Sequence, residues 1–328
     1  MKSQKKIDTN KDLSKLNSLK IEVKAKYFIE CKTDSDLKIA FNFIKKNKLK
    51  FLILGDGTNI FFKKSFEGLI IKNNFKEEKK IIKNKVKVSS GYNWDKFVSF
   101  CIKNSLYGLE NLSGIPGTVG AGPIQNIGAY GVEISNYINH VEVFNFKSGN
   151  IEILNNANCD FDYRDSSFKK NKHLFIKNIF FNLKDKFTAN NSYQDLQDYK
   201  FKKAFEIRKA ILKIRNQKLE NHLIKPNLGS FFKNPLIRNE DLKKLLSREP
   251  DLKFYKHNSQ VKVSAAWLIE KCNFKGVKIN KAQVSKKHSL VLLNEEKSPK
   301  SIIKLKNKIK TVVQRKYNIK LEEEPTIV

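Results

Sequence analysis

Glycine is concentrated in one segment of this chain. Seven of its 14 glycines fall within residues 108–131, although the chain has 328 residues and is otherwise poor in glycine. Glycine lacks a Cβ atom, so it tolerates positive φ angles and lets the backbone approach a neighbour or a ligand closely. A glycine-rich loop of this length inside a folded domain usually has a function. A purely structural loop is the alternative.

The order of residues within this segment restricts the ligands it can bind. Residues 113–131 read SGIPGTVGAGPIQNIGAYG. Its glycines follow G-x-x-G-x-x-G, which differs from the dinucleotide fingerprint G-x-G-x-x-G, and no phosphate-loop lysine follows. Clustered glycines together with Thr118, Gln125 and Asn126 nevertheless suit a backbone that packs against a flat ring and a diphosphate.

A second glycine turn lies nearer the N-terminus. The short apolar run 51–54 predicts a buried strand, and Gly55-Asp56-Gly57-Thr58-Asn59 follows it as a tight turn. Backbone N–H groups in such a turn can face an anion, and the last two side chains add further donors. A hairpin turn without a ligand is the alternative.

The net charge of +32 admits two interpretations. Lysine and arginine together number 65 against 33 acidic residues, and six of the 65 are arginine. A nucleic-acid-binding protein concentrates its charge and uses arginine to read base edges, and it would show steeply salt-dependent DNA binding. Here lysine is spread along the chain and rises together with Asn, Ile and Phe, as A/T-rich codons would make it. We therefore expect no specific nucleic-acid partner, although a positive field would steer anionic substrates inward.

Apolar runs and cysteines bound the cellular location and the cofactor class. No apolar run approaches the roughly 20 residues that span a bilayer, and the first residues are polar, without the apolar region of a signal peptide. We expect a cytoplasmic protein with no membrane partner. Cys31, Cys101, Cys159 and Cys272 lie far apart and lack metal-ligand spacing, so we expect reduced thiols and no metal site.

Strand patterns and helix patterns are mixed along the chain, which predicts an α+β fold. Strands are expected at 21–30, 51–54, 69–72, 85–89 and 290–293, and helices at 34–46, 94–101, 204–214 and 264–272. A last helix is expected to begin at Ser298 and Pro299. Its inward residues are predicted to be Ile302, Leu305, Ile309 and Val312. Residues 216–227 predict a connection between domains, and residues 1–16 a frayed polar lead-in.

Several motifs between residues 17 and 324 resemble, in the same order, those of one enzyme family. Residues 113–131 resemble the flavin-binding signature of the UDP-N-acetylenolpyruvoylglucosamine reductases, GIPG-x-VGG-x-P-x-QNIGAYG. Residues 55–59 are similar to the family's first FAD loop and residues 17–21 to its opening N-T-F-x-I. FDYRDS at 161–166, GSFFKNP at 229–235, AAWLI at 265–269 and LEEE at 321–324 are similar to its Y-R-x-S, G-S-F-F-x-N-P, third-domain helix and L-E-x-E elements.

The resemblance implies a fold and a reaction. The implied fold is a two-lobed FAD-binding domain of the PCMH, or vanillyl-alcohol-oxidase-like, type, followed by a C-terminal α+β substrate domain. We expect the first over residues 17–225, with lobes at about 17–72 and 73–225, and the second over 226–328 with a tail that returns to the flavin. The implied reaction is reduction of UDP-N-acetylglucosamine enolpyruvate to UDP-N-acetylmuramate with FAD and NADPH in peptidoglycan precursor synthesis, by a monomer.

The resemblance also implies three catalytic residues whose chemistry suits that reaction. Arg164 carries a permanent, forked positive charge for the carboxylate on which negative charge develops. Ser230 would donate the proton that the α-carbon receives. Glu324 could donate a hydrogen bond only in its protonated form, which burial would favour.

The implied ligand contacts form two sets. The cofactor contacts are Gly55, Asp56, Gly57, Thr58, Asn59, Ser113, Gly114, Ile115, Pro116, Gly117, Thr118, Gly120, Gln125, Asn126, Gly128 and Ala129. The substrate contacts are Tyr163, Tyr193, Arg215, Lys218 and Asn234. Arg215 and Lys218 would neutralise the diphosphate, and Tyr193 lies in a stretch similar to the T-Y-G-D-L loop of one subtype.

Three positions depart from the family pattern. Ser285 stands where the family usually has histidine, Ala121 replaces the second glycine of the VGG run, and Pro325 follows Glu324 where a β-branched residue is usual. None of these removes an implied catalytic group. They motivate a further alternative, a flavoprotein that binds a nucleotide sugar but has lost turnover.

Overall fold

The chain folds into two compact units. The computed structural model describes residues 7–76 and 79–328, so the first six residues of the expected lead-in lie outside the described residues. Unit 1 consists of residues 1–11, 24–57 and 66–215, and unit 2 of residues 12–23, 58–65 and 216–328. The domain limits expected from the sequence were contiguous, whereas two short N-terminal segments here belong with the C-terminal residues. We describe each unit by itself.

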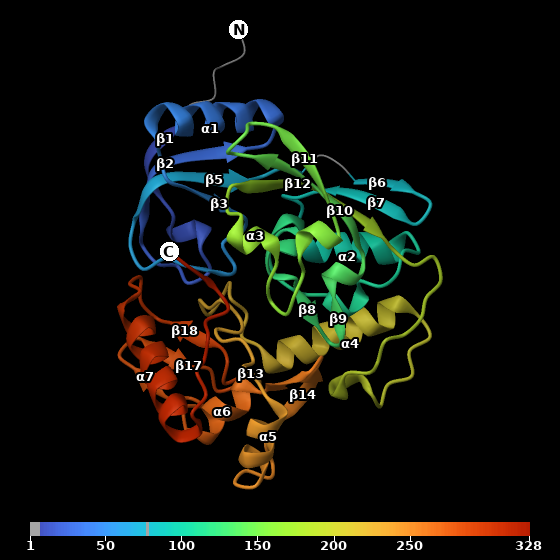
Figure 1. Cartoon of the computed structure of the whole chain (residues 1–328), viewed down its shortest axis with the longest axis vertical. Helices are drawn as coiled ribbons and strands as arrows, with labels where there is room; N and C mark the ends of the chain where they lie inside the picture. The colour runs from blue at the N-terminus through green and yellow to red at the C-terminus, as the bar shows by residue number, and fades with distance from the viewer. Residues whose placement is uncertain (1–6, 77–78) are drawn as a thin grey trace. The chain divides into compact units, whose positions relative to one another are not determined.

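Unit 1 contains a four-stranded sheet in the order β1-β2-β5-β3. Its strands are β1 (Asp8–Asp12), β2 (Lys24–Cys31), β5 (Phe66–Asn73) and β3 (Phe51–Leu54). The central strand β5 is parallel to both β2 and β3, and parallel strands need a crossover between them. Helix α1 (Asp34–Asn47) makes the crossover from β2 to β3 and lies along the sheet (Figure 1). A capping box of Thr33 and Asp36 begins the helix.

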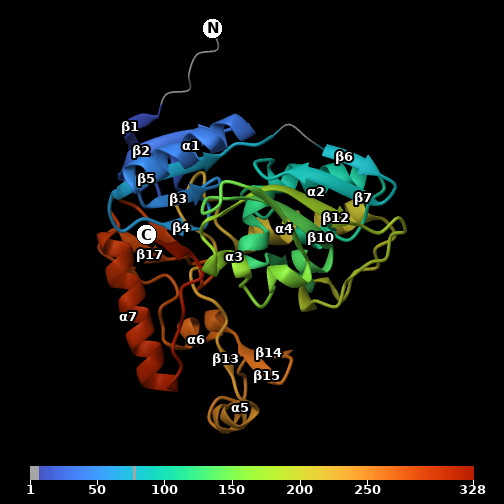
Figure 2. The ribbon, with the colours of Figure 1, turned by 45° about the horizontal axis from the view of Figure 1, so that its top comes forward.

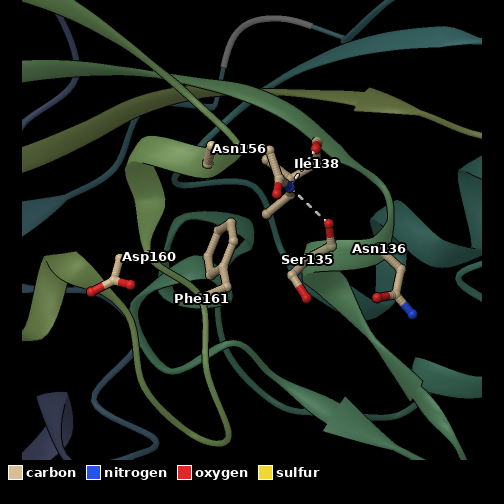
Figure 3. A pocket seen from close by; sticks show the side chains of 7 residues that line it. Ser135, Asn136, Ile138, Asn156, Asp160 and Phe161 are labelled. Carbon is tan, nitrogen blue, oxygen red and sulfur yellow. Dashed lines mark hydrogen bonds between the residues drawn. The ribbon is translucent and has the colours of Figure 1, made fainter.

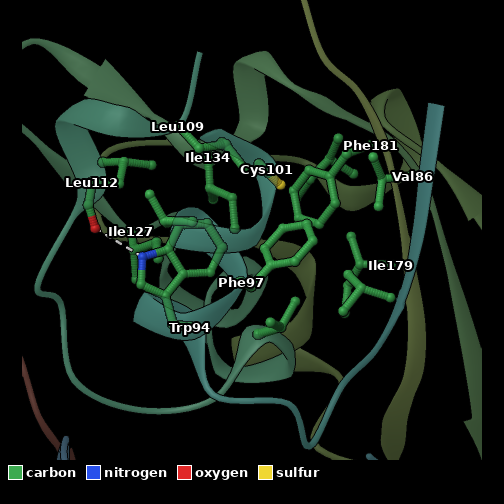
Figure 4. Close-up of a cluster of buried hydrophobic side chains, with 14 of the residues drawn as sticks. Val86, Trp94, Phe97, Cys101, Leu109, Leu112, Ile127, Ile134, Ile179 and Phe181 are labelled. Atoms are coloured by element: carbon green, nitrogen blue, oxygen red, sulfur yellow. Dashed lines mark hydrogen bonds between the residues drawn. The ribbon is translucent and has the colours of Figure 1, made fainter. Parts of the chain in front are cut away.

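A five-stranded antiparallel sheet, in the order β11-β10-β12-β7-β6, forms the second layer of unit 1. Its strands are β6 (Lys79–Ile82), β7 (Lys85–Ser89), β10 (Ile138–Asn145), β11 (Ile151–Asn155) and β12 (Leu174–Asn182). Helix α2 (Trp94–Lys103) packs Trp94 and Phe97 into the hydrophobic cluster that covers this sheet (Figure 4). The indole N–H of Trp94 donates to the carbonyl oxygen of Leu112 at 2.9 Å, so burial leaves it satisfied.

The remaining elements of unit 1 surround the glycine-rich segment. They are β8 (Gly128–Ala129), β9 (Val132–Glu133), α3 (Ser167–Lys170) and α4 (Ala204–Lys218), whose last residues belong to unit 2. Helix α4 buries Ile207, Ile211 and Ile214 against Leu196. It ends at Lys218, four residues beyond the predicted end at 214, so the polar stretch 216–227 begins as helix rather than as a connection.

Unit 2 is built from short strands and three helices along its described residues. The helices are α5 (Asn239–Leu246), α6 (Ala265–Lys271) and α7 (Lys300–Tyr317), the last being the long red helix in Figure 2. The sheets are β13 (Leu236–Ile237) with β15 (Gln260–Val263) and β14 (Phe254–His257), and β16 (Lys278–Ile279) with β17 (Ala282–Val284) and β18 (Leu292–Asn294). Strand β19 (Thr326–Ile327) is parallel to β4 (Ile60–Phe61).

Long-range contacts explain why the short N-terminal segments belong to unit 2. Leu13 and Leu19 are completely buried, and the side-chain amide of Asn294 donates to the carbonyl oxygen of Leu19 at 2.9 Å. The backbone N–H of Glu22 donates to the carbonyl oxygen of Lys297 at 2.7 Å. Residues 8–12 form β1 rather than a frayed end.

Most elements predicted from periodicity are confirmed, with local corrections. The predicted strands 51–54 and 85–89 have the observed limits, and Ser264 caps α6 by accepting from the N–H of Trp267. The predicted strand 21–30 begins only at Lys24. The inward assignment of Val312 is wrong, because Val313 is the completely buried residue. Val313 follows Ile309 by four residues, which returns to the same helix face.

Within the described ranges, no helix is both long and apolar enough to cross a membrane.

A buried lysine connects α1 to the five-stranded sheet in unit 1. The ammonium group of Lys177, whose side chain is 8% exposed, lies 2.8 Å from a carboxylate oxygen of Asp34 and 3.1 Å from one of Glu142. Burial alone would lower the pKa of Lys177, but its hydrogen bonds to Asp34 and Glu142 raise it above 10.5. As long as Asp34 and Glu142 are ionised, the charge of Lys177 therefore stabilises the fold fully below pH 10.5, and this contribution is lost as the pH rises through the raised value.

Replacing Lys177 with methionine is expected to lower the free energy of unfolding by about 1–3 kcal/mol. The carboxylate of Glu142 then stays half-buried without its cation, whereas the more exposed Asp34 loses little. Urea unfolding of wild type and variant measures the difference. The matched control is Lys170→Met, which removes an ion pair with Asp160 that is 74% exposed on both sides. Equal stabilities of the two variants would contradict the structural role of Lys177.

Candidate functional site

The glycine-rich segment 113–131 is fixed against the turn that follows β7. The N–H of Gly120 donates to the carbonyl oxygen of Ser90 at 2.7 Å, and the N–H of Val119 to that of Tyr92 at 2.8 Å. A Cβ atom on Gly120 would lie 2.5 Å from the Cβ atom of Ser90, closer than real Cβ atoms come. Glycine at this position thus allows the two backbones to meet.

Helix α4 closes on the same segment at Gly114. This glycine has φ +73°, and a Cβ atom there would meet Leu212 at 2.8 Å and the Nε atom of Arg215 at 3.1 Å. Its N–H donates to Asp95 at 2.6 Å, and Arg208 clamps the same carboxylate through two bonds of 2.5 and 2.7 Å. Burial opposes ionisation of Asp95, but Arg208 and the N–H of Gly114 together hold its pKa below the usual value. The start of the segment is therefore held by α2 and α4 together.

The two predicted glycine sites meet within unit 1. A Cβ atom on Gly55 would lie 3.1 Å from the hydroxyl oxygen of Thr118 and 3.8 Å from Cβ of Ala121. Thr118 is 3% exposed, and among the described residues its hydroxyl has no hydrogen-bond partner. Leaving a buried hydroxyl unsatisfied costs about 1–3 kcal/mol. A polar group of a bound ligand would satisfy it, so the cradle of Gly55 and Thr118 fits the polar part of a cofactor.

The turn that contains Gly55 is divided between the two units. The ammonium group of Lys72 donates to the carbonyl oxygen of Gly55 at 2.7 Å and to the carboxylate of Asp56 at 3.0 Å, which holds the turn in unit 1. Gly57 follows with φ +67°. Thr58 and Asn59 belong to unit 2.

Not every predicted cofactor contact has a free side chain. The hydroxyl of Ser113 donates to the carbonyl oxygen of Glu110 at 2.6 Å in a completely buried position. The amide of Asn126 donates to Glu133 at 2.9 Å and to the carbonyl oxygen of Asp162 at 3.1 Å, and it accepts from Ser135. These two side chains hold the segment in shape. Within residues 113–131, the partly or fully exposed members of the predicted set are Gly114, Ile115, Pro116, Gln125, Gly128 and Ala129, whereas Gly117 is buried with φ +118°.

The structure brings Arg164 to the glycine-rich segment. Its guanidinium donates to the carbonyl oxygen of Gly128 at 2.5 Å and lies 5.3 Å from the ring centre of Tyr163. Arg164 has φ +52°, an unfavourable left-handed conformation for this residue type. Lys169, which donates to the carbonyl oxygen of Arg164, and Ser166, which donates to Ile124 at 2.7 Å, hold this turn in place.

Tyr193 also reaches the segment, through contacts that sequence reasoning missed. Its ring meets that of Tyr130 edge to face at 5.3 Å. The buried amide of Asn111 donates to the carbonyl oxygens of Tyr130 and Asn190, both at 2.8 Å, so one side chain joins the two loops. Arg215, predicted to face a substrate diphosphate, is partly exposed and hydrogen-bonded to the side chain of Tyr130. The sequence contained only one indication of the contacts of Asn111, which is that this residue lies two positions before the segment.

In unit 2 the structure places Ser230 and Glu324 around one buried residue. Phe231 is completely buried, and its N–H donates to the carbonyl oxygen of Leu290 at 2.8 Å. Ser230 immediately precedes it, and the N–H of Glu324 donates to its carbonyl oxygen at 3.0 Å. Gly229 has φ +70° and open space around its Cβ position. Both predicted acids of the reaction therefore lie on neighbouring backbone segments.

Two predicted substrate contacts are also in unit 2. The side-chain oxygen of Asn234 accepts from the N–H of Ala265 at 3.0 Å, where α6 begins. Lys218 is the last residue of α4, near His288. Burial, and then the charge of Lys218, lower the pKa of His288.

A surface cavity of about 600 Å³ in unit 1 is lined by residues of the ranges 135–138 and 156–161 (Figure 3). Asn156 is one of the lining residues, and its side-chain amide donates to the carbonyl oxygens of Ser135 at 2.9 Å and Ile138 at 2.8 Å. Phe161, the first residue of the FDYRDS motif, forms part of its lining. None of the predicted site residues lines this cavity.

Comparisons with known proteins show the family of this chain. Residues 217–328 match the family model described as UDP-N-acetylenolpyruvoylglucosamine reductase, C-terminal domain, and residues 25–155 match an FAD binding domain. The UDP-N-acetylenolpyruvoylglucosamine reductase of Buchnera aphidicola subsp. Baizongia pistaciae is 38% identical over 96% of this chain and 98% of its own length. The chain belongs to the UDP-N-acetylenolpyruvoylglucosamine reductase family. The enzyme of that name from Pseudoalteromonas translucida is 39% identical over 86% of both chains.

Family membership makes the chain an FAD-linked oxidoreductase. The crystal structure of the reductase from Thermus caldophilus has the same fold, with a TM-score of 0.71 over 99% of both chains at 19% identity. The predicted fold class, an α+β FAD-binding domain followed by a C-terminal domain, is therefore confirmed.

Replacing Thr118 with valine is expected to separate cofactor binding from folding. Valine keeps the shape and removes the unsatisfied hydroxyl, so the cofactor-free protein should be as stable as wild type or up to about 1 kcal/mol more stable. Loss of one ligand hydrogen bond should raise the Kd for FAD about tenfold. Flavin fluorescence titration and urea unfolding measure the two effects. Thr311→Val, at an exposed position of α7, is the control, and an unchanged Kd for FAD would contradict a ligand contact at Thr118.

Proposed function

We propose that this protein reduces UDP-N-acetylglucosamine enolpyruvate to UDP-N-acetylmuramate with NADPH, through FAD, in peptidoglycan precursor synthesis. The observation that supports this most directly is the bond from the Arg164 guanidinium to Gly128. It holds a permanent cation on the segment that resembles the family's flavin-binding signature. Bound FAD would supply hydride chemistry, taking up hydride from NADPH and delivering it to the double bond of the substrate.

The proposed cofactor cradle is formed by backbone groups and by the hydroxyl of Thr118. Gly55 and Thr118 would hold FAD together with the exposed backbone of residues 114–116 and 128–129. Backbone groups in such glycine-rich turns suit a diphosphate. The close packing at Gly120 would keep the cradle rigid before the cofactor binds, which reduces the entropy lost on binding.

Arg164 is proposed to bind the carboxylate of the enolpyruvyl group. Negative charge builds on that carboxylate when the β-carbon receives hydride, so a fixed cation stabilises the transition state more than the ground state. The bond to Gly128 and the contact with Tyr163 limit the motion of the guanidinium. Arginine also presents two parallel donors to a carboxylate, which lysine does not.

Ser230 is proposed to donate the proton that the α-carbon receives. Glu324, in its protonated form, is proposed to donate a hydrogen bond beside it. Both lie next to the completely buried Phe231, so their backbones are fixed. Tyr163, Tyr193, Lys218 and Asn234 are proposed as contacts of the nucleotide sugar. Arg215, which is hydrogen-bonded to Tyr130, is proposed to neutralise the substrate diphosphate together with Lys218. We further propose that the protein acts in the cytoplasm as a monomer.

An anaerobic stopped-flow experiment at the flavin absorption band tests the proposed function. NADPH is expected to bleach the band of the FAD-loaded protein, and UDP-N-acetylglucosamine enolpyruvate is expected to restore it. Titration with UDP-N-acetylglucosamine, which lacks the double bond, is the control and should restore nothing. Bleaching without recovery by the enolpyruvyl substrate would contradict the assigned substrate.

Replacing Ser230 with alanine is expected to separate the two half-reactions. Bleaching by NADPH should proceed at the wild-type rate, and recovery with the enolpyruvyl substrate should slow by about 10²-fold or more, the usual effect of losing a positioned acid. The same stopped-flow traces measure both rates. Ser247→Ala, at an exposed position of unit 2, serves as the control. Recovery at the wild-type rate would remove Ser230 from its proposed role.

A further inference from the structure

Two lysines of α7 hold the side chain that directly precedes Glu324. A carboxylate oxygen of Glu323 accepts from Lys306 at 2.8 Å and from Lys310 at 2.9 Å, and its other oxygen accepts from Lys310 at 3.0 Å. The side chain of Glu323 is 18% exposed, and those of Lys306 and Lys310 are 13% and 28% exposed. A cluster with this little exposure is screened much less by salt than a surface pair.

The two lysines belong to a helix that is fixed by buried residues. They are four residues apart, so they share one helix face and their ammonium groups lie close together. Leu305 and Ile309, which precede each of them by one residue, are completely buried and fix the helix. Like charges at this spacing repel each other, and the carboxylate of Glu323 between them removes that repulsion. Burial opposes ionisation of Glu323, but hydrogen bonds from Lys306 and Lys310 lower its pKa to about 2, so its charge is present at every pH at which the protein would work.

Backbone bonds pair the same residues with residues 231–233 in an isolated antiparallel bridge. Glu323 pairs with Phe232 in an antiparallel bridge, the N–H of Lys233 donates to Glu322 at 2.9 Å, and the N–H of Glu324 donates to Phe231 at 3.0 Å. Successive side chains of an extended strand point to opposite faces. Because the carboxylate of Glu323 is held on α7, the side chain of Glu324 is directed to the other face.

The next residue leaves a gap in the N–H bonds of the tail. Pro325 has no N–H to donate, so the side chain of Glu323 adds an anchor beside this gap. The following bond, from the N–H of Thr326 to the carbonyl oxygen of Asn59, is 3.1 Å long. Glu323 occupies the variable position of the L-E-x-E element.

We propose that Glu323, held by Lys306 and Lys310, is a positioning residue that sets the orientation of Glu324 in the active site. This inference rests on the proposed function, because it concerns the step in which the substrate is reduced and protonated. Glu323 touches neither substrate nor cofactor in this role. It acts through the direction of the neighbouring side chain, and small displacements of a reacting group reduce rates strongly.

Replacing Glu323 with glutamine in the full-length, FAD-loaded protein tests the inference. Glutamine keeps the size of the side chain but loses the charge that binds both lysines. Bleaching by NADPH is expected to keep its wild-type rate, and recovery with the enolpyruvyl substrate to slow about tenfold. The pair Lys306→Met and Lys310→Met should slow recovery equally, while Lys306→Arg with Lys310→Arg should restore most of it. Lys304→Met with Lys308→Met, at exposed positions of the same helix, is the matched control and should behave as wild type.

A double-mutant cycle with Glu324→Gln distinguishes positioning from general stabilisation. If Glu323 acts through Glu324, adding Glu323→Gln to Glu324→Gln should slow recovery no further. Amide hydrogen exchange at Glu324 and Thr326 should be faster in Glu323→Gln than in wild type, which shows the loosened tail without reference to activity. Additive effects on recovery, or a wild-type recovery rate in Glu323→Gln, would overturn the inference alone. A wild-type protein whose flavin the substrate does not reoxidise would overturn the proposed function and this inference with it.

Discussion

Close approach of backbone segments around residues 113–131 is the constraint on which the site in unit 1 depends. A Cβ atom would collide with Ser90 at Gly120 and with α4 at Gly114, so the segment can occupy this position only as a glycine-rich chain. The C-terminal end of the segment then serves as a fixed point for other groups. Gly128 holds Arg164, and Tyr130 holds Asn111 and, through it, the loop of Tyr193. A segment that could shift would lose all of these contacts together.

Polar side chains convert that close packing into a defined shape. Asp95 takes one hydrogen bond from the backbone of Gly114 and two from Arg208, so the start of the segment is tied to helices α2 and α4. Bidentate pairs of this kind have stricter geometry than a single bond. In unit 2 the C-terminal tail is held in place by pairing with Phe232 and with β4. Two positions that depart from the family pattern fit this arrangement. Ser285 is completely buried and donates to Glu220 at 3.1 Å. Pro325 lies between Glu324 and Thr326, whose N–H groups make the backbone bonds of the tail.

Local patterns predicted well those elements whose limits depend on their own residues. Helix α2 follows from Trp94, Phe97 and Cys101 on one face and from Asn93 as its cap. The motifs also picked out the two glycine turns that meet at Gly55 and Thr118, and the residues around Phe231. The polar composition of 216–227 misled the prediction of a connection, because α4 continues to Lys218. The hydrogen bond between Arg215 and Tyr130 could not be predicted from the sequence, since the partner of a helix side chain is settled by what packs on that helix.

The sequence by itself determined the family, the FAD-binding character and the order of the motifs, because these depend on residue types at short spacings. Only the tertiary structure decided that residues 12–23 and 58–65 belong with the C-terminal unit, that Lys177 joins Asp34 to Glu142, and that α7 holds Glu323. These contacts join residues that are up to 275 positions apart. Ion pairs and hydrogen bonds over such separations arise when the fold brings the partners together, and a lysine-rich chain offers too many possible partners for periodicity or spacing to select among them.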